Sequence, residues 1–211
     1  MKENLKIKIC GMRDHDNIVE VATFQPDLMG FIFYEKSPRF VGSDFIVPPT
    51  FPSAIKRVGV FVNASTEEMI QQMQRLELDF LQLHGKESAA QVAALATRGA
   101  KVIKAFSVDD NFDFEQVKPY EGLASYFLFD TKGEYYGGNA KVFNWRVLAK
   151  YNQHTPFFLS GGLTPENVVE IEPLKDMNLY ALDINSGVER SPGVKDLEKI
   201  KALYKVKETI S

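Results

Sequence analysis

The amino-acid sequence predicts a single α/β domain, a (β/α)8 or TIM barrel, that spans residues 1–211. Two observations predict it. Short apolar runs alternate with segments of helical spacing along the whole chain, and eight such units leave little room for a second domain. No linker or low-complexity stretch marks a domain boundary. An open, doubly wound sheet remains the alternative, because alternation alone does not show that a sheet closes.

Eight apolar runs have the length of strands. Several are apolar on consecutive residues, as at 30–33 and 58–62, and this is typical of parallel strands that are covered on both faces. An antiparallel sandwich would show a cleaner alternation of apolar and polar residues. We expect strands at residues 6–12, 28–33, 57–62, 80–84, 102–106, 126–130, 157–159 and 179–184.

Apolar residues recur at helical spacing between these runs. Helix starts are indicated by Asp14, by Ser65 or Thr66, and by Thr164, where Pro165 suits the first helical position. The weakest units are the second, where 40–53 is rich in proline and aromatic residues, and the fifth, where 111–122 has little helical periodicity. We expect helical segments around residues 18–22, 69–73, 92–96, 147–148, 168–171 and 197–203.

The composition is that of a globular protein, with 45% hydrophobic and 25% charged residues. A net charge of -3 argues against a nucleic-acid surface and favours a small-molecule substrate. Cys10 is the single cysteine, so no internal disulfide is expected, and no apolar stretch approaches the ~20 residues of a membrane span. We expect a cytoplasmic protein without nucleic-acid or membrane partners; the oligomeric state stays open, with a monomer favoured.

In a barrel, functional residues lie at the carboxyl ends of the strands. Cys10 ends the first run, just before Gly11, and is a candidate base. Asp130 follows three apolar residues, and a carboxylate there is costly to desolvate unless it is paired or protonated, which suits a general acid. Structural interpretations stay open for both, since a free cysteine is often simply buried and Asp130 could cap a turn with Thr131.

Glycines follow the seventh and eighth strands, where barrels commonly bind phosphate. Gly161 and Gly162 come after Ser160, and Gly187 comes after Ser186. Backbone N–H groups of the two loops could converge on one anion, so we assign phosphate binding to Gly161, Gly162, Ser186 and Gly187. The alternative is that the glycines only permit tight turns.

Three further strand ends carry candidates for substrate binding. The guanidinium of Arg39 suits a carboxylate, although a solvated turn arginine is the alternative. His84 could contact substrate or serve as a hydrogen-bonded structural histidine, and Asp183 could bind a substrate hydroxyl. The chain has three histidines, too few for a metal site built on several of them, so no metal is expected.

Several motifs, in order along nearly the whole chain, carry a resemblance to a known family. They are Lys8-Ile9-Cys10-Gly11-Met12-Arg13, Ser37-Pro38-Arg39, Leu81-Gln82-Leu83-His84-Gly85, Phe129-Asp130-Thr131, Ser160-Gly161-Gly162 and Asp183-Ile184-Asn185-Ser186-Gly187. The sequence resembles the phosphoribosylanthranilate isomerases of tryptophan biosynthesis. The resemblance implies a (β/α)8 barrel that catalyses, without a cofactor, the Amadori rearrangement of N-(5'-phosphoribosyl)anthranilate to 1-(2-carboxyphenylamino)-1-deoxyribulose 5-phosphate.

The resemblance also implies roles for the candidate residues. Asp130 would be the general acid at the ribose ring oxygen, and Cys10 the general base at C2'. Because an unperturbed thiol is mostly protonated near pH 7, we expect the N-terminus of the following helix and Arg13 to favour the thiolate of Cys10. Arg39 would hold the anthranilate carboxylate and Asp183 a ribose hydroxyl, while the two glycine loops would hold the phosphate. The chain departs from the family at Gly137-Gly138-Asn139-Ala140, where a Gly-Gly-Thr-Gly run is common, which affects the sixth loop and spares Asp130.

Two other functions compete with this interpretation. Another phosphosugar barrel, such as a ribulose-phosphate epimerase or the next synthase of the pathway, would need metal-binding histidines or a catalytic lysine, and neither fits Cys10 and Asp130. A non-catalytic barrel that binds phosphosugars is the alternative from a different class.

Overall fold

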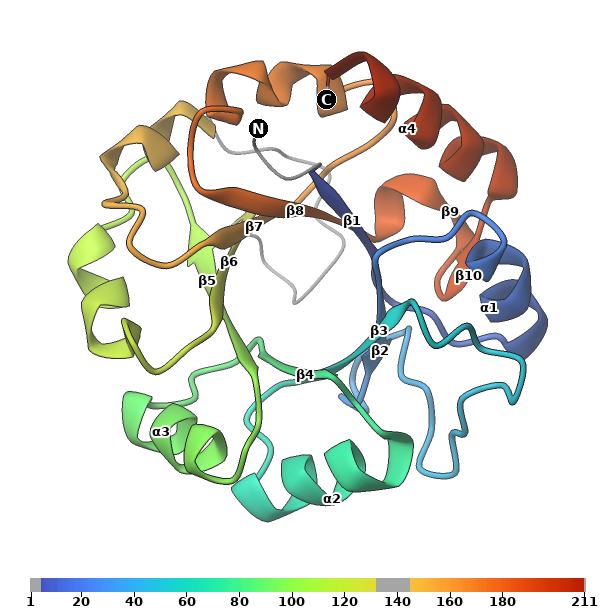
Figure 1. The fold of residues 1–211 in the computed structure, drawn as a ribbon, viewed down its shortest axis with the longest axis horizontal. Helices are drawn as coiled ribbons and strands as arrows, with labels where there is room; N and C mark the ends of the chain where they lie inside the picture. The colour runs from blue at the N-terminus through green and yellow to red at the C-terminus, as the bar shows by residue number, and fades with distance from the viewer. Residues whose placement is uncertain (1–4, 132–144, 211) are drawn as a thin grey trace.

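Eight parallel strands form a closed barrel in sequence order in a computed structural model, which describes residues 5–131 and 145–210 (Figure 1). Strand β8 pairs with β1 in parallel, with Lys8 opposite Asp183, so the sheet has no open edge. This confirms the predicted barrel and excludes the open sheet. The strands are β1 Lys6–Ile9, β2 Leu28–Ile32, β3 Lys56–Phe61, β4 Phe80–Leu83, β5 Val102–Val108, β6 Tyr126–Thr131, β7 Phe157–Ser160 and β8 Leu179–Ile184.

Helical segments surround the strands (Figure 1). The α-helices of the described residues are α1 His15–Ala22, α2 Thr66–Leu76, α3 Ala89–Thr97 and α4 Leu197–Ile210. The later connections instead carry the 3-10 segments η1 Phe114–Tyr120, η2 Trp145–Lys150 and η3 Val168–Leu174. Pro119 and Pro173 lie inside η1 and η3, where proline prevents a regular α-helical ladder. None of the described helices is long and apolar enough to cross a membrane.

The helix-start signals are confirmed at two of three positions. Asp14 accepts a hydrogen bond from the N–H of Asn17 at 2.9 Å, and Ser65 caps α2 in the same way. At the third, the predicted start is wrong, because Thr164 exchanges hydrogen bonds with Asn167 in a turn and η3 begins only at Val168. Between β2 and β3 the structure has turns and no helix, in line with the weak pattern at 40–53.

Side chains inside the barrel change from apolar to polar along the strands. An apolar layer fills the interior, formed by Leu28, Val58, Phe80, Ile103, Ala105, Leu128, Phe158 and Ala181. Because strand side chains repeat with a period of two, the next inward positions on β2, β4, β6 and β8 are Gly30, Gln82, Asp130 and Asp183. The apolar layer therefore supports a polar layer at the carboxyl ends.

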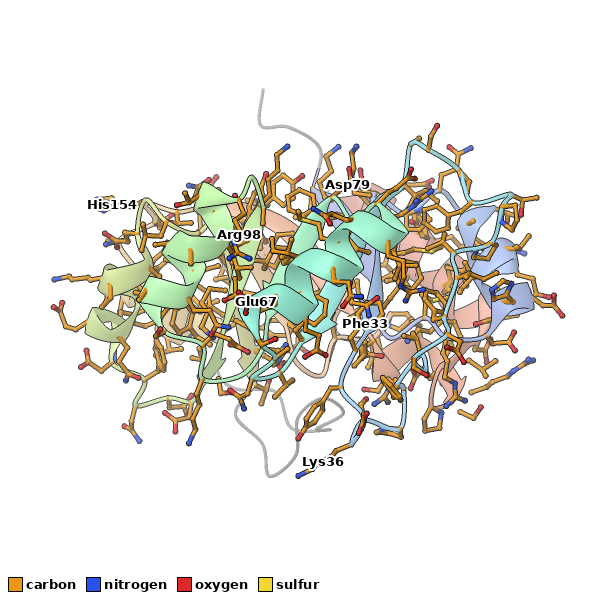
Figure 2. All side chains as sticks on the ribbon, turned by 90° about the horizontal axis from the view of Figure 1, so that it is seen from below. Phe33, Lys36, Glu67, Asp79, Arg98 and His154 are labelled. Carbon is orange, nitrogen blue, oxygen red and sulfur yellow. The ribbon has the colours of Figure 1, made fainter. Side chains whose placement is uncertain are left out.

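The carboxyl ends of the strands open at one face of the molecule. In Figure 2, Lys36, which follows β2, lies at the lower edge, while Asp79, which precedes β4, lies at the upper edge. After β8 the chain adds the short segment η4 Ser186–Val188 and a hairpin of β9 Glu189–Ser191 and β10 Val194–Lys195, which the sequence analysis did not anticipate.

Candidate active site

A pocket of about 730 Å³, including the part open to solvent, lies at the carboxyl ends of the strands. Its size is that of a site for a small organic ligand. It brings together eight of the nine predicted site residues, which come from β1, β4, β6, β7 and β8 or the loops that follow them: Cys10, His84, Asp130, Gly161, Gly162, Asp183, Ser186 and Gly187. Arg39 is the predicted residue that does not line this pocket.

Cys10 lies beside a buried ion pair. The Lys8 Nζ donates to Asp183 Oδ1 at 2.7 Å, and both side chains are almost completely buried. The positive charge of Lys8 also acts on the thiol of Cys10 and lowers its pKa. A Cβ on Gly30 would lie 2.7 Å from the Cys10 sulfur and 3.0 Å from Lys8 Nζ, so a glycine on β2 is what leaves room for both groups inside the barrel.

Burial dominates the protonation of the thiol. Desolvation raises the pKa of Cys10 above its ordinary value, and the cations of Lys8 and Lys195 offset this only in part. Burial also lowers the pKa of Lys8, but the charges of Asp183 and Cys10 outweigh it and hold that pKa above the ordinary value. Lys8 is therefore a permanent cation next to the thiol at neutral pH.

Arg13 does not supply the positive charge beside Cys10 that the sequence analysis expected of it. The Arg13 guanidinium donates to the carbonyl oxygens of Pro38 and Pro192 and lies in an exposed position. Lys8 and Lys195 supply the positive charge at Cys10 instead. Sequence reasoning missed Lys8, although a signal was present, because residues 8 and 10 of one strand must point to the same side of the sheet.

Asp130 belongs to a row of hydrogen-bonded side chains on the other side of the pocket. Its Oδ2 lies 3.1 Å from His84 Nε2, and His84 Nδ1 lies 3.0 Å from Gln82 Nε2. Asp130 and His84 are each 14% exposed, so both remain open to a ligand. His84 thus has hydrogen-bonded partners and also lines the pocket. Its two interpretations, as a structural histidine and as a residue that contacts substrate, are therefore compatible.

A buried ion pair fixes the loop that carries His84. Lys104 Nζ donates to Glu87 Oε2 at 3.0 Å and to the carbonyl oxygen of Gly85 at 2.8 Å. Glu87 Oε1 in turn accepts the backbone N–H groups of Asn63 and Gly85. Both ends of this loop are therefore tied to neighbouring strands, which holds the imidazole at a defined place on the pocket wall.

The two glycine loops pack directly against each other and against β6. Gly161 has a φ of +94°, and a Cβ there would lie 2.2 Å from Thr131 Oγ1. A Cβ on Gly187 would lie 1.9 Å from the carbonyl oxygen of Leu163, in the loop after β7. Close approach thus requires glycine at both positions, and at Gly161 the backbone conformation requires it as well. The two loops together form one wall of the pocket.

Arg39 is held outside the pocket lining by an acidic partner. Its Nη2 donates to Glu189 Oε2 at 2.7 Å and its Nε contacts both carboxylate oxygens. Lys195 Nζ donates to Glu189 Oε1 at 2.8 Å and to Asn185 Oδ1 at 2.9 Å, so the hairpin after β8 links Arg39 to the loop after β8. Burial lowers the pKa of Lys195 to about 8, against the opposing effect of Glu189.

The charged groups around Cys10 are not balanced. Lys8, Lys195 and Arg39 face the carboxylates of Asp183 and Glu189, so one positive charge is left over when the thiol is neutral. An anion in the pocket, either a thiolate or a group of the substrate, would neutralise this excess. Within the described residues, no three or more His, Cys, Asp or Glu side chains are arranged to hold a metal ion.

The fold and the pocket define a class: a (β/α)8 barrel with a carboxyl group, a thiol group and two glycine loops in one pocket at its mouth. The model of the N-(5'-phosphoribosyl)anthranilate isomerase family matches residues 7–206. The chain therefore belongs to this family.

Individual relatives agree with this assignment. The N-(5'-phosphoribosyl)anthranilate isomerase of Parabacteroides distasonis is 46% identical over 202 residues, which are 92% of this chain and 90% of that protein. The crystal structure of the Thermotoga maritima phosphoribosyl anthranilate isomerase is 32% identical with a TM-score of 0.83, over 97% of this chain and 99% of that one. A further structure of such an isomerase, in complex with reduced 1-(o-carboxyphenylamino)-1-deoxyribulose 5-phosphate, has a TM-score of 0.79 at 30% identity, with coverage of 97% and 99%.

Proposed function

We propose that this chain isomerises N-(5'-phosphoribosyl)anthranilate to 1-(2-carboxyphenylamino)-1-deoxyribulose 5-phosphate, an Amadori rearrangement in tryptophan biosynthesis. The observation that carries the proposal is the single pocket that joins Cys10, Asp130 and both glycine loops. Family membership supports the choice of substrate, because the similar curated proteins carry the name of this isomerase.

Asp130 acts first, as the general acid. It protonates the ring oxygen of the ribose while the bond between C1' and that oxygen breaks, and the anilino nitrogen supplies the electron pair that forms a Schiff base. The N–H of His84 can hydrogen-bond the carboxylate that remains, because the two groups are 3.1 Å apart. This hydrogen bond stabilises the charge that develops on Asp130 as the proton leaves.

Cys10 then acts as the general base and not as a covalent nucleophile. Its thiolate takes the proton from C2', and the electron pair of that C–H bond forms the C1'–C2' double bond as the Schiff base is neutralised. The resulting enol tautomerises to the ketone by gaining a proton at C1', so the reaction is an isomerisation that needs no cofactor. Lys8 lies next to the sulfur and favours the thiolate against the cost of burial.

The remaining pocket residues bind and orient the substrate. The loops of Gly161 and Gly187 offer backbone N–H groups to the 5'-phosphate, and Asp183, which is ion-paired with Lys8, binds a ribose hydroxyl. Arg39 would reach the anthranilate carboxylate with Nη1, which makes no hydrogen bond within the described residues. The departure at Gly137-Gly138-Asn139-Ala140 lies outside the described residues, so its effect on substrate contacts stays a prediction.

Two variants test this function. A fluorescence assay that follows the loss of the anthranilate substrate should show a loss of turnover in Cys10→Ala and in Asp130→Asn, by at least about 10²-fold. Calorimetric titration with the reduced product analogue should show that both variants still bind. Near-parental rates in either variant would contradict the assigned mechanism, and binding by the parent without turnover would favour the non-catalytic barrel. A cytoplasmic location, a monomeric state and a single domain over residues 1–211 stay predictions.

A further inference from the structure

Gln82 is a pocket residue with no role in the steps above. It lies on β4, is 1% exposed and places Nε2 at 3.0 Å from Nδ1 of His84. Its own carbonyl oxygen is buried and has no partner within the described residues. A buried amide oxygen without a hydrogen-bond partner costs free energy of folding. The hydrogen bond to His84 is therefore the interaction that favours glutamine at this position.

An amide N–H can only donate, and this determines where the proton of His84 lies. Because Nδ1 accepts from Gln82, a neutral imidazole must carry its single proton on Nε2. Nε2 is the atom that faces Oδ2 of Asp130 at 3.1 Å. His84 is thereby a donor to Asp130, and Oδ2 is an acceptor whether or not the carboxyl is protonated.

The opposite tautomer would place the acidic proton wrongly. If Nδ1 carried the proton, Nε2 would have to accept from Asp130, and the carboxyl proton would lie on Oδ2, directed at the imidazole. With Oδ2 occupied as an acceptor, the proton of Asp130 lies on Oδ1 instead. Within the described residues Oδ1 has no hydrogen-bond partner, so it is the oxygen available to a ligand in the pocket.

We propose that Gln82 is a positioning residue for the acid step: it holds His84 in the tautomer that donates to Asp130, so that the carboxyl proton is carried on Oδ1 and faces the substrate. The inference deepens the proposed function and rests on it for the role of Asp130. Gln82 itself does not touch the reacting atoms. It acts through His84, whose loop is independently fixed by Lys104 and Glu87.

Nitrogen NMR of the imidazole tests the tautomer directly, since it distinguishes protonated from unprotonated ring nitrogens. The chain has three histidines, which a His84→Ala spectrum assigns. At about pH 8 we expect the parent to have a protonated Nε2 and an unprotonated Nδ1 at His84. In Gln82→Glu the new carboxylate should accept from Nδ1, so that nitrogen becomes protonated. A parental His84 protonated at Nδ1, or an unchanged tautomer in Gln82→Glu, would overturn the proposal.

Kinetics test the consequence. In Gln82→Met the side-chain size is kept and the donor is lost, so kcat should fall about tenfold with KM changed less than about twofold. In a His84→Ala background the same substitution should have no further effect. Gln91→Met is the matched control, because Gln91 donates to the carbonyl oxygen of Ala64 and does not line the pocket, and it should keep the parental kcat.

The outcomes separate this inference from the proposed function. If Asp130→Asn keeps parental turnover, the acid assignment fails, whereas the NMR tautomer is still measured independently. If Asp130→Asn is inactive but Gln82→Met keeps the parental kcat, or lowers kcat equally with and without His84, the role of Gln82 fails while the acid assignment stands. Urea unfolding of Gln82→Met identifies any loss of activity that comes from a loss of folded protein.

Discussion

Replacing Lys8 by methionine should destabilise the protein far more than replacing an exposed lysine that makes an equivalent contact. Lys8 Nζ lies 2.7 Å from Asp183 Oδ1 in the barrel interior, and removing it leaves a buried carboxylate without its cation. Breaking one side of a buried pair costs about 3–5 kcal/mol. Lys56 makes a matching contact of 2.9 Å with Asp79, but it is 52% exposed, so Lys56→Met should cost at most ~1 kcal/mol.

Urea unfolding of the parent and of both variants at neutral pH measures this difference. Lys8→Met combined with Asp183→Asn should recover much of the lost free energy of unfolding, because the double variant no longer buries an unpaired charge. Equal losses in Lys8→Met and Lys56→Met, or a double variant as unstable as Lys8→Met alone, would refute the reasoning. In the folded fraction, Lys8→Met should also shift the activity profile to higher pH, since the Cys10 thiol loses the cation that lowers its pKa most.

Two further predictions concern the loops after β7 and β8. Lys195 has a folded pKa of about 8, below its ordinary 10.5, so between these values the unfolded chain binds more protons than the folded chain. Relative to Lys195→Met, the parent's free energy of unfolding should therefore rise by ~2 kcal/mol from about pH 8 to 10. Urea titrations in which the difference between parent and variant does not change with pH would contradict this. Gly161→Ala should cost about 2 kcal/mol or more and weaken calorimetric phosphate binding, because its Cβ would lie 2.2 Å from Thr131 Oγ1. Gly99→Ala is the control, with a φ of +84° and open space; an equal loss of stability there would show that backbone strain alone explains Gly161.

The barrel and its pocket could be predicted from the sequence because their signals are local. Each strand is a short apolar run, and Asp14 and Ser65 mark helix starts within three residues of the N–H groups they cap. The 3-10 segments were harder to predict from the sequence, because apolar spacing is similar in α-helices and 3-10 turns. Only Pro119 and Pro173 indicate the difference. Thr164 misled the prediction because the same side chain can cap a helix or close a turn.

The ionic contacts of the site could not be predicted, because their partners are far apart in the chain. Lys8 and Asp183 are separated by 175 positions and Arg39 and Glu189 by 150. A lysine in an apolar run also looks like a solvent-facing residue of an alternating strand, whereas Lys8 lies on the inner side, with Cys10. The sequence analysis therefore named eight residues that the pocket brings together and missed the buried lysines that act on the pKa of Cys10.

The proposed roles of Cys10 as general base and Asp130 as general acid are tested most directly by the kinetic isotope effect on kcat with substrate deuterated at C2'. In Cys10→Ser, removal of the C2' hydron should become rate-limiting, so the variant should be slow and should show a large primary isotope effect. In Asp130→Asn, ring opening should limit the rate before C2' reacts, so the isotope effect should be close to one. A large effect in Asp130→Asn together with none in Cys10→Ser, or a Cys10→Ser variant as fast as the parent, would contradict the assignment of Cys10 as base and Asp130 as acid.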